Sequence, residues 1–249
     1  MAEKEKDWRD YLQVNPTTTI TINGIIYGEE GTGKSTLASS DPQAVLVDCG
    51  RSARFLKTRR MDASGWDIST HLRFLDAFLK SPEGNLHYDE TTTLIKQIED
   101  HIIIETEGNL KKDINNIGRG FGEGGRKVQK FLRNEFFARW REIQEQHGSN
   151  ILLYCHAEER PSGEETTQKE FRLRMTQKYA QTLMEWADLI GHLKLKEEKY
   201  MENGVTKTRV HQQRLLQLHQ TERATAKNRF GITEEISDPT WKAIMERLQ

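Results

Sequence analysis

The sequence predicts an α/β fold, in which a mainly parallel sheet is flanked by helices, from three observations. Apolar, β-branched runs alternate along the 249 residues with stretches whose apolar residues recur at helical spacing, the order that builds a parallel sheet. The first apolar run leads directly into a glycine-rich loop and the start of a helix. Glu202-Asn203-Gly204 is a strong turn signal between two late strands, so we also expect a C-terminal antiparallel hairpin.

The first half of the chain contains the elements around the glycine-rich loop. Ala44 to Asp48 is wholly apolar until its final carboxylate, as a buried parallel strand should be. The segment between Gly50 and Gly84 carries several bases, typical of a solvated surface, and one helix. We expect strands at 18–27, 44–48 and 85–88, and helices at roughly 71–80 and 91–104.

The second half of the chain begins with an unusual composition. Five glycines lie within eight positions between Gly118 and Gly125, which predicts a segment without regular structure. Beyond it we expect a long helix at 128–147, a buried strand at 150–156, a second loop at 157–170, a helix at 176–187, a strand at 189–195 and the hairpin. The predicted divisions are an N-terminal arm at 1–17, a core domain at 18–236 and a C-terminal helix at 237–249.

Composition restricts the possible function classes. The net charge of −1 excludes a global cationic field, so any contact with nucleic acid must be local. No run approaches the roughly 18 apolar residues of a membrane-spanning helix, and the charged N-terminus is unlike a signal peptide. Cys49 and Cys155 each end an apolar run, which favours buried free thiols over a disulfide. We therefore expect a cytoplasmic protein with no membrane contact.

The glycine-rich loop matches the pattern G-x-x-x-x-G-K-[ST]. Between a strand and a helix, such a loop wraps backbone N–H groups around phosphates, while Lys34 supplies a charge and the Ser35 hydroxyl a Mg²⁺ ligand. The alternative is a tight glycine turn that carries Lys-Ser by coincidence. We predict a site for ATP and Mg²⁺ formed by Gly28, Glu29, Glu30, Gly31, Thr32, Gly33, Lys34, Ser35 and Thr36.

Hydrolysis of ATP needs a second carboxylate near Mg²⁺. Two predicted strands end in acids, Asp48 and Asp89. We favour Asp89, because a crossover helix separates its strand from the loop, with Asp48 as the alternative metal ligand. The simpler interpretation of either residue is an ordinary acid at the end of a strand.

Several short motifs resemble, in the same order, those of phage RecA-like ATPases, a group that includes annealing-type recombinases and phage nucleotide-binding proteins. The resemblance spans about residues 18–240, and Lys227-Asn228-Arg229-Phe230-Gly231 is also similar to the K-N-R-F-G motif of bacterial RadA. The motifs are the glycine-rich loop, Val47-Asp48, Gly118 to Gly122, Leu152 to Ala157, Glu185 to Asp188 and Ala226 to Gly231.

The resemblance implies a RecA-like P-loop ATPase encoded by a phage and working in the host cytoplasm. Such a protein would assemble with its own copies, as a ring or filament, on single-stranded DNA and promote annealing or strand exchange, with a single-strand DNA-binding protein as a further partner. Lys227 and Arg229 would reach the ATP site of a neighbouring copy, and His156 would sense the γ-phosphate. Two surface bases and a hydrogen-bonded histidine are the simpler interpretations.

The glycine-rich segment corresponds, by the same resemblance, to a DNA-facing loop. Arg119, Arg126 and Lys127 would hold phosphates while Phe121 stacks on a base, a sequence-tolerant way to bind single strands. The alternative is a mobile connector. Four later bases either extend this track or belong to an exposed charged hairpin: Lys169, Arg172, Arg174 and Lys178.

One departure from the resemblance concerns hydrolysis. After the second strand, relatives carry an acid that orients the attacking water, whereas this chain has Gly50 in Asp48-Cys49-Gly50-Arg51. Glu90, directly after Asp89, is the substitute we favour, and Glu30 is a weaker one. Without a substitute, the protein would be a nucleotide-dependent DNA-binding assembly switch with little or no ATPase activity. A small-molecule kinase is a further alternative, disfavoured because residues 157–170 are acidic rather than basic.

Overall fold

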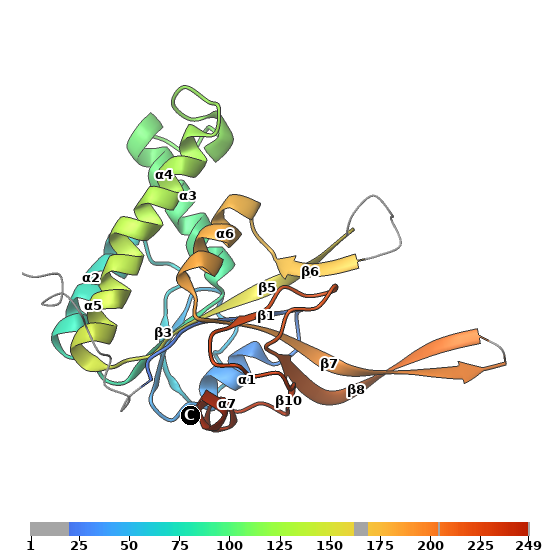
Figure 1. The fold of residues 1–249 in the computed structure, drawn as a ribbon. Helices are drawn as coiled ribbons and strands as arrows, with labels where there is room; N and C mark the ends of the chain where they lie inside the picture. Colours follow the sequence, from blue (N-terminus) through green and yellow to red (C-terminus); the bar gives the residue numbers. More distant parts are fainter. Residues whose placement is uncertain (1–19, 162–168, 204, 249) are drawn as a thin grey trace, which may run out of the picture.

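The computed structural model describes residues 20–161, 169–203 and 205–248 (Figure 1). The expected N-terminal arm at 1–17 lies outside the described residues, as do residues 18 and 19 of the expected first strand. So do the tip of the expected second loop at 162–168 and the turn residue Gly204.

A single ten-stranded sheet organises the described part of the chain, in the order β10-β8-β7-β1-β5-β4-β2-β3, with β6 paired to β5 and β9 to β7. The six strands from β7 across to β3 are parallel, and the remaining pairings are antiparallel. The strands are β1 (Asn23–Gly28), β2 (Ala44–Asp48), β3 (Arg59–Asp62), β4 (Asn85–Asp89), β5 (Ile151–Pro161), β6 (Lys169–Leu173), β7 (Leu189–Glu202), β8 (Val205–Gln217), β9 (Lys227–Asn228) and β10 (Ile236–Ser237).

Helices cover both faces of the sheet (Figure 1). β1 shows how: Ile25 and Tyr27 face one buried cluster, whereas Ile26 faces the other, because successive side chains of a strand alternate. The first cluster packs under α2 (Ile68–Lys80), α3 (Thr91–Glu107), the 3₁₀ turn η2 (Ile114–Asn116), α4 (Glu123–Phe131), the π-helical turn η3 (Leu132–Phe137), α5 (Ala138–His147) and α6 (Gln177–Trp186). The second packs under α1 (Lys34–Ser39) and α7 (Trp241–Leu248).

The predicted fold class is confirmed. The sheet is mainly parallel and flanked by helices, and β7 and β8 form the expected antiparallel hairpin, which projects far from the body (Figure 1). In the described ranges, no helix is both long and apolar enough to span a bilayer.

The strand β3 was not predicted. Its sequence, Arg-Arg-Met-Asp, is charged and carries no strand pattern. It forms because the edge of β2 offers unpaired backbone groups, and Val45 to Asp48 pair in register with Arg59 to Asp62. The following helix α2 begins at Ile68, earlier than expected, because the Asp67 carboxylate accepts a hydrogen bond from Thr70 N at 2.7 Å.

The prediction that the glycine-rich segment lacks regular structure was wrong for its second half. Helix α4 begins at Glu123, not at 128, and includes Gly124 and Gly125. A Cβ on Gly124 would lie 1.9 Å from the Ile114 carbonyl oxygen, so glycine here allows close packing on η2. Gly122 caps the helix with a φ of 74°.

The described ends of the second expected loop, 157–161 and 169–170, belong to paired strands. Ala157 to Pro161 continue β5 beyond the body of the sheet and pair antiparallel with β6. This arrangement corresponds to the charged-hairpin alternative: Arg172 is bonded to Glu170 at 2.7 Å. The side chain of Lys169 is not described.

Candidate functional site

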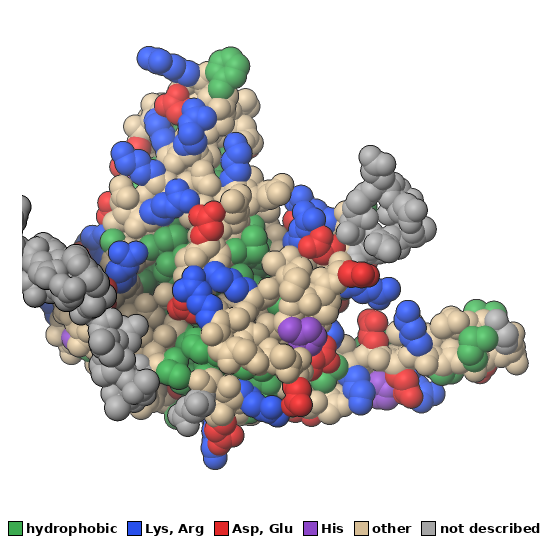
Figure 2. Space-filling model, in the orientation of Figure 1, with side chains coloured by type: hydrophobic (Ala, Val, Ile, Leu, Met, Phe, Trp, Pro, Cys, Tyr) green, Lys and Arg blue, Asp and Glu red, His purple; other side chains and the backbone are tan. Residues whose placement is uncertain are grey.

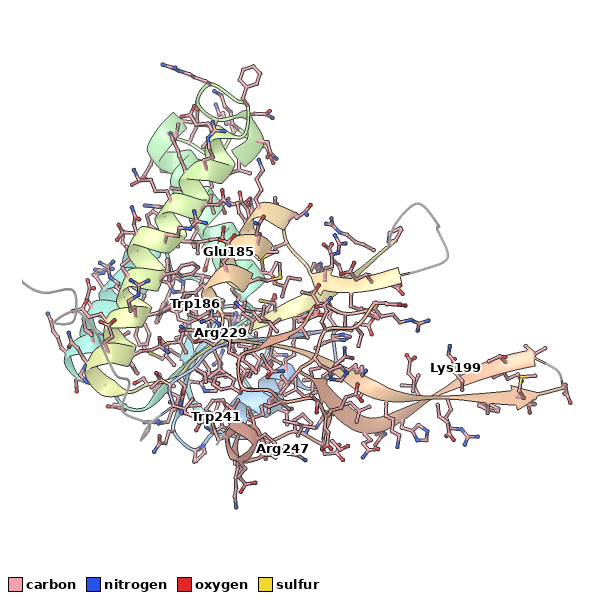
Figure 3. All side chains as sticks on the ribbon, in the orientation of Figure 1. Glu185, Trp186, Lys199, Arg229, Trp241 and Arg247 are labelled. Carbon is pink, nitrogen blue, oxygen red and sulfur yellow. The ribbon has the colours of Figure 1, made fainter. Side chains whose placement is uncertain are left out.

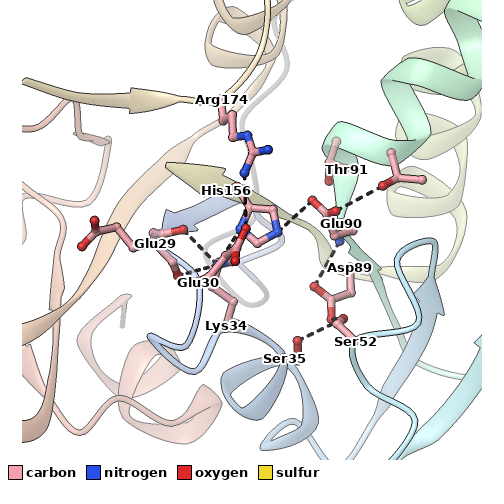
Figure 4. Close-up of polar contacts among 12 residues, drawn as sticks. Glu29, Glu30, Lys34, Ser35, Ser52, Asp89, Glu90, Thr91, His156 and Arg174 are labelled. Atoms are coloured by element: carbon pink, nitrogen blue, oxygen red, sulfur yellow. Dashed lines mark hydrogen bonds and ion pairs between the residues drawn. The ribbon is translucent and has the colours of Figure 1, made fainter. Parts of the chain in front are cut away.

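The carboxyl ends of three parallel strands bring the predicted site residues together. Gly28, which ends β1, is in register with His156 of β5, and Asp89, which ends β4, is in register with Tyr154. Because parallel strands finish at one edge of a sheet, the loop after β1, the acids after β4 and the histidine of β5 line the same space. Figure 4 shows these side chains converging on Lys34.

The loop after β1 holds Lys34 in a buried position at the first residue of α1. Its ammonium donates to the carbonyl oxygens of Gly28 at 2.9 Å and Glu29 at 2.8 Å. Burial lowers the pKa of Lys34, and the charges of Asp89 and Glu90 oppose that shift. A Cβ on Gly28 would lie 2.2 Å from the Leu193 carbonyl oxygen, so the start of the loop requires glycine.

Hydroxyl and carboxylate oxygens form a chain beside Lys34. Ser52 Oγ lies 3.3 Å from Ser35 Oγ and donates to Asp89 Oδ2 at 2.6 Å. Such hard oxygen ligands are those that Mg²⁺ prefers. Within the described ranges, no cluster of three or more His, Cys, Asp or Glu side chains could hold a metal ion. Sequence reasoning missed Ser52, whose only signal is its place just after a strand-end acid.

The other predicted metal ligand, Asp48, has a different environment. Its carboxylate is fully buried and accepts hydrogen bonds from Ser52 N and Ala53 N, both at 3.0 Å, and from Arg60 Nε at 2.6 Å. These contacts hold the loop that presents Ser52. The geometry therefore favours Asp89 over Asp48 as the candidate Mg²⁺ ligand.

Glu90 and His156 form a polar pair at 3.3 Å between Glu90 Oε1 and His156 Nε2. The other ring nitrogen of His156 lies 3.4 Å from Lys34 Nζ, so the imidazole joins the carboxylate to the loop lysine. Burial lowers the pKa of His156; the Glu90 charge opposes this and the Lys34 charge adds to it. The lowered pKa favours the neutral imidazole, which can both donate and accept a hydrogen bond.

Glu90 stands in the space that an acid at position 50 would need. A Cβ on Gly50 would lie 2.7 Å from Glu90 Cγ, so a larger residue there would displace the Glu90 side chain. Glu90 also has a φ of 66°, uncommon for a residue with a side chain, and its carboxylate accepts no capping hydrogen bond from the backbone of α3. Its Oε2 instead accepts a hydrogen bond from Thr93 Oγ1 at 3.1 Å.

A cavity of about 420 Å³ opens above the loop, lined by Glu30, Gly31, Gly33, Lys34, Ser35, Thr36, Ser52, Phe55, Leu56, Asp89, Glu90, His156 and Arg214. Sequence reasoning missed Phe55 and Arg214. The Phe55 ring is 83% exposed and carries the Arg54 guanidinium 4.6 Å from its centroid, so it offers an aromatic face at the cavity mouth. An isolated phenylalanine in a basic segment gives no signal of this in the sequence.

A second cavity of about 310 Å³ adjoins the first across the Glu90 and His156 pair. Glu30 and Arg174 lie at its edge, paired at 3.3 Å, and both are exposed. Arg174, named as one extension of a DNA-binding track, thus lies beside the phosphate loop (Figure 4).

Lys227 and Arg229 are not part of this cluster. Lys227 Nζ donates to the carbonyl oxygens of Met184 at 2.9 Å and Ala187 at 2.6 Å, and Arg229 donates to Asp188 at 2.8 Å. Figure 3 labels Arg229 near Trp186, at the end of α6. Asp188 also accepts from Asn23 N, at the amino end of β1. Since β1 reaches Gly28 at about 3.3 Å per residue, these bases lie roughly 17 Å from the loop of their own chain.

The predicted DNA-binding residues lie on a projection formed by α3, η2 and α4, where Figure 2 shows basic and apolar side chains together. Phe121 is 96% exposed at a φ of 50°, and Arg126 Nη1 donates to its carbonyl oxygen at 3.0 Å. Arg119 is exposed, whereas Lys127 pairs with Glu123 at 3.3 Å. The four residues are therefore close in space but distant from the phosphate loop.

The fold and the loop define a RecA-like P-loop NTPase, which supports nucleotide binding. The chain belongs to the AAA domain family (AAA_24), whose family model matches residues 21–230. Among solved structures, the flagellar accessory protein FlaH from Methanocaldococcus jannaschii is similar at 12% identity with a TM-score of 0.37, over 86% of this chain and 83% of that one. The comparison with curated proteins found no match.

Proposed function

We propose that this protein is an ATP-binding, phage-encoded recombination protein that assembles with copies of itself on single-stranded DNA in the host cytoplasm and promotes annealing or strand exchange. The observation that carries the nucleotide-dependent part is the convergence of Lys34, Asp89, Glu90 and His156 around the phosphate loop. DNA as the partner is supported by the projecting Phe121 with its neighbouring arginines.

The residues present fit a nucleotide with Mg²⁺. In the part of the chain that the structure describes, Lys34 is bonded to carbonyl oxygens of its own loop and to His156, and it can exchange these for phosphate oxygens. Ser35 and Asp89 would hold Mg²⁺, which when bound neutralises negative charge on the phosphates. The Ser52 hydroxyl, which bridges Ser35 and Asp89, would then move aside or hydrogen-bond to the ligands of the ion.

Hydrolysis rests on Glu90 as the residue that orients water. Its carboxylate faces the cavity next to Asp89, and it occupies the volume above Gly50 where relatives carry their acid. One ring nitrogen of His156 lies against the Glu90 carboxylate and the other against Lys34, so the contacts of His156 would change with the presence of the γ-phosphate. The loss of an acid at position 50 is in this way matched by an acid from the neighbouring strand.

Glu90→Gln should bind ATP with unchanged affinity and lower its turnover about 100-fold, because glutamine keeps the acceptor for Thr93 but cannot take a proton. The measurement is phosphate release with and without single-stranded DNA, alongside ATP binding by titration. Glu30→Gln is the matched control, because Glu30 lines the same cavity but pairs only with the exposed Arg174.

The alternative function, an assembly switch with little or no ATPase activity, makes the opposite prediction for the same assay. If the wild-type protein releases no phosphate above background with DNA present, the switch is supported and the role of Glu90 is rejected. If Glu30→Gln rather than Glu90→Gln stops turnover, the protein hydrolyses ATP but Glu30 is the acid that orients the water.

Phe121→Ala should weaken binding of single-stranded DNA about 10-fold, the effect of losing one base stack, without changing ATP binding at the distant loop. Fluorescence anisotropy measures the affinity over a range of salt concentrations. A steep decrease with salt indicates phosphate contacts, such as those proposed for Arg119 and Arg126, and separates this function from a small-molecule kinase.

The matched control for Phe121 is Met201→Ala. Met201 is 68% exposed near the tip of the other projection, the β7 and β8 hairpin. Unchanged DNA affinity in Phe121→Ala, or an equal loss in Met201→Ala, would contradict the placement of DNA on the α3 and α4 projection.

A further inference from the structure

Arg214 of β8 lies across the phosphate loop of its own chain. A Cβ on Gly33 would be 2.4 Å from Arg214 Nε and 2.8 Å from Arg214 Cζ, so the guanidinium lies directly against this glycine. Gly33 has a φ of 93° and directly precedes Lys34. The two cations therefore line one cavity, Lys34 from the loop itself and Arg214 from a distant strand.

The guanidinium of Arg214 has no acceptor for its buried nitrogen. Nε is buried, and among the residues that the structure describes it has no hydrogen-bond partner and Arg214 has no ion pair with a carboxylate. A half-buried arginine normally pairs with a carboxylate or phosphate, because leaving a buried donor unsatisfied costs stability. The missing acceptor indicates an anionic ligand in the cavity.

The backbone around Arg214 holds its side chain in place. Arg214 N donates to Asp238 Oδ1 at 3.0 Å, and the Arg214 carbonyl oxygen accepts from Asp238 N at 2.7 Å. Asp238 adopts a φ of 44°, a strained conformation of the kind found at functional sites. The register of β7 and β8 also shifts beside Arg214: Leu195 pairs with Arg214, but Glu197 pairs with Val210, an irregularity of the kind often found next to functional sites.

We infer that Arg214 is a polyphosphate ligand supplied in cis: its guanidinium contacts phosphate oxygens of the bound nucleotide from the side of Gly33. Arginine suits this role because its fork of N–H groups matches two phosphate oxygens at once. The inference rests on the proposed nucleotide binding. It adds to Lys34 a second cation, carried by the strand that continues into the projecting hairpin.

Titration of Arg214→Gln with MgATP, MgADP and inorganic tripolyphosphate tests the inference. We expect all three affinities to fall roughly 10- to 100-fold, the range for losing a charge-assisted hydrogen bond, while the melting temperature of the ligand-free protein stays within about 2 °C of wild type. Arg214→Lys keeps the positive charge but lacks the planar fork of N–H groups, so its affinities should lie between those of wild type and those of Arg214→Gln. Arg209→Gln is the matched control, because Arg209 is on the same strand but stacks on Tyr200.

Three results would overturn the inference. A lower melting temperature with unchanged affinities would make Arg214 a structural latch on the loop. A loss for ATP and ADP but not for tripolyphosphate would place the guanidinium on the base or ribose. An equal loss in Arg209→Gln would indicate a general charge effect. Failure of the proposed function looks different, because the wild-type protein would then bind none of the three ligands.

Discussion

Lys34→Ala should abolish nucleotide binding, with affinity for MgATP reduced at least about 1,000-fold, and should remove any stimulation of DNA binding by ATP. The ammonium is the buried cation of the loop, and its present acceptors are two backbone carbonyls and His156. Its removal takes away the positive charge that lies closest to Asp89 and Glu90 in the loop, so these carboxylates would repel phosphate oxygens more strongly. Isothermal titration and anisotropy with labelled single-stranded DNA measure the two effects.

Lys96→Ala is the control for Lys34. Lys96 lines the adjoining cavity but is 60% exposed and pairs with Glu99 and Asp100 on its own helix, so we expect ATP affinity within about twofold of wild type. Undiminished ATP binding by Lys34→Ala would refute the phosphate loop itself. If Lys34→Ala lost ATP binding but ATP still stimulated its binding to DNA, the proposed coupling between nucleotide binding and DNA binding would be rejected.

Arg229→Ala should keep ATP binding within about twofold but lower turnover at least about 1,000-fold, because we propose that Arg229 acts on the nucleotide of a neighbouring copy. Its guanidinium is 60% exposed, and its pairing with Asp188 at the surface is easily exchanged. Arg229 does not lie near the phosphate loop of its own chain. It contacts residues at the amino ends of the parallel strands, whereas the loop follows the carboxyl end of β1. Turnover and sedimentation in ATP, with and without DNA, measure the effect.

Arg133→Ala is the matched control for Arg229. Arg133 is 52% exposed and pairs with Glu185, three residues before the partner of Arg229, so it tests the loss of a similar surface charge. Full turnover and assembly by Arg229→Ala would reject the trans role. Lys227 makes a less suitable probe: its ammonium caps the last carbonyls of α6, so Lys227→Ala would also destabilise that helix.

The sequence alone predicted much of the core of the site because its signals are local. The order of strand, glycine-rich loop and helix predicted the positions of Lys34 and Ser35. Asp89 and His156 each end a predicted strand, which predicted that both lie at the carboxyl ends of a parallel sheet. The open choice between Asp89 and Asp48 could not be resolved, because it depends on Arg60 and the Ser52 loop, which occupy the Asp48 carboxylate.

Other features were missed because their causes lie far away in the chain. Strand β3 follows from the free edge of β2, and the early start of α4 follows from the space that Gly124 leaves for the Ile114 carbonyl. Arg214 is an ordinary base in a charged strand until the hairpin folds back over Gly33. None of these contacts leaves a pattern in neighbouring residues.

The sequence by itself determined the α/β class, the phosphate loop and the order of the strands around it, because hydrophobic periodicity and glycine spacing act over a few residues. Only the tertiary structure decided that Arg60 and the Ser52 loop occupy the Asp48 carboxylate, that Glu90 lies against Gly50, that Arg214 reaches the loop and that Lys227 and Arg229 do not reach it in their own chain. The physical reason is that hydrogen bonding and steric fit depend on distances between side chains that the fold alone brings together.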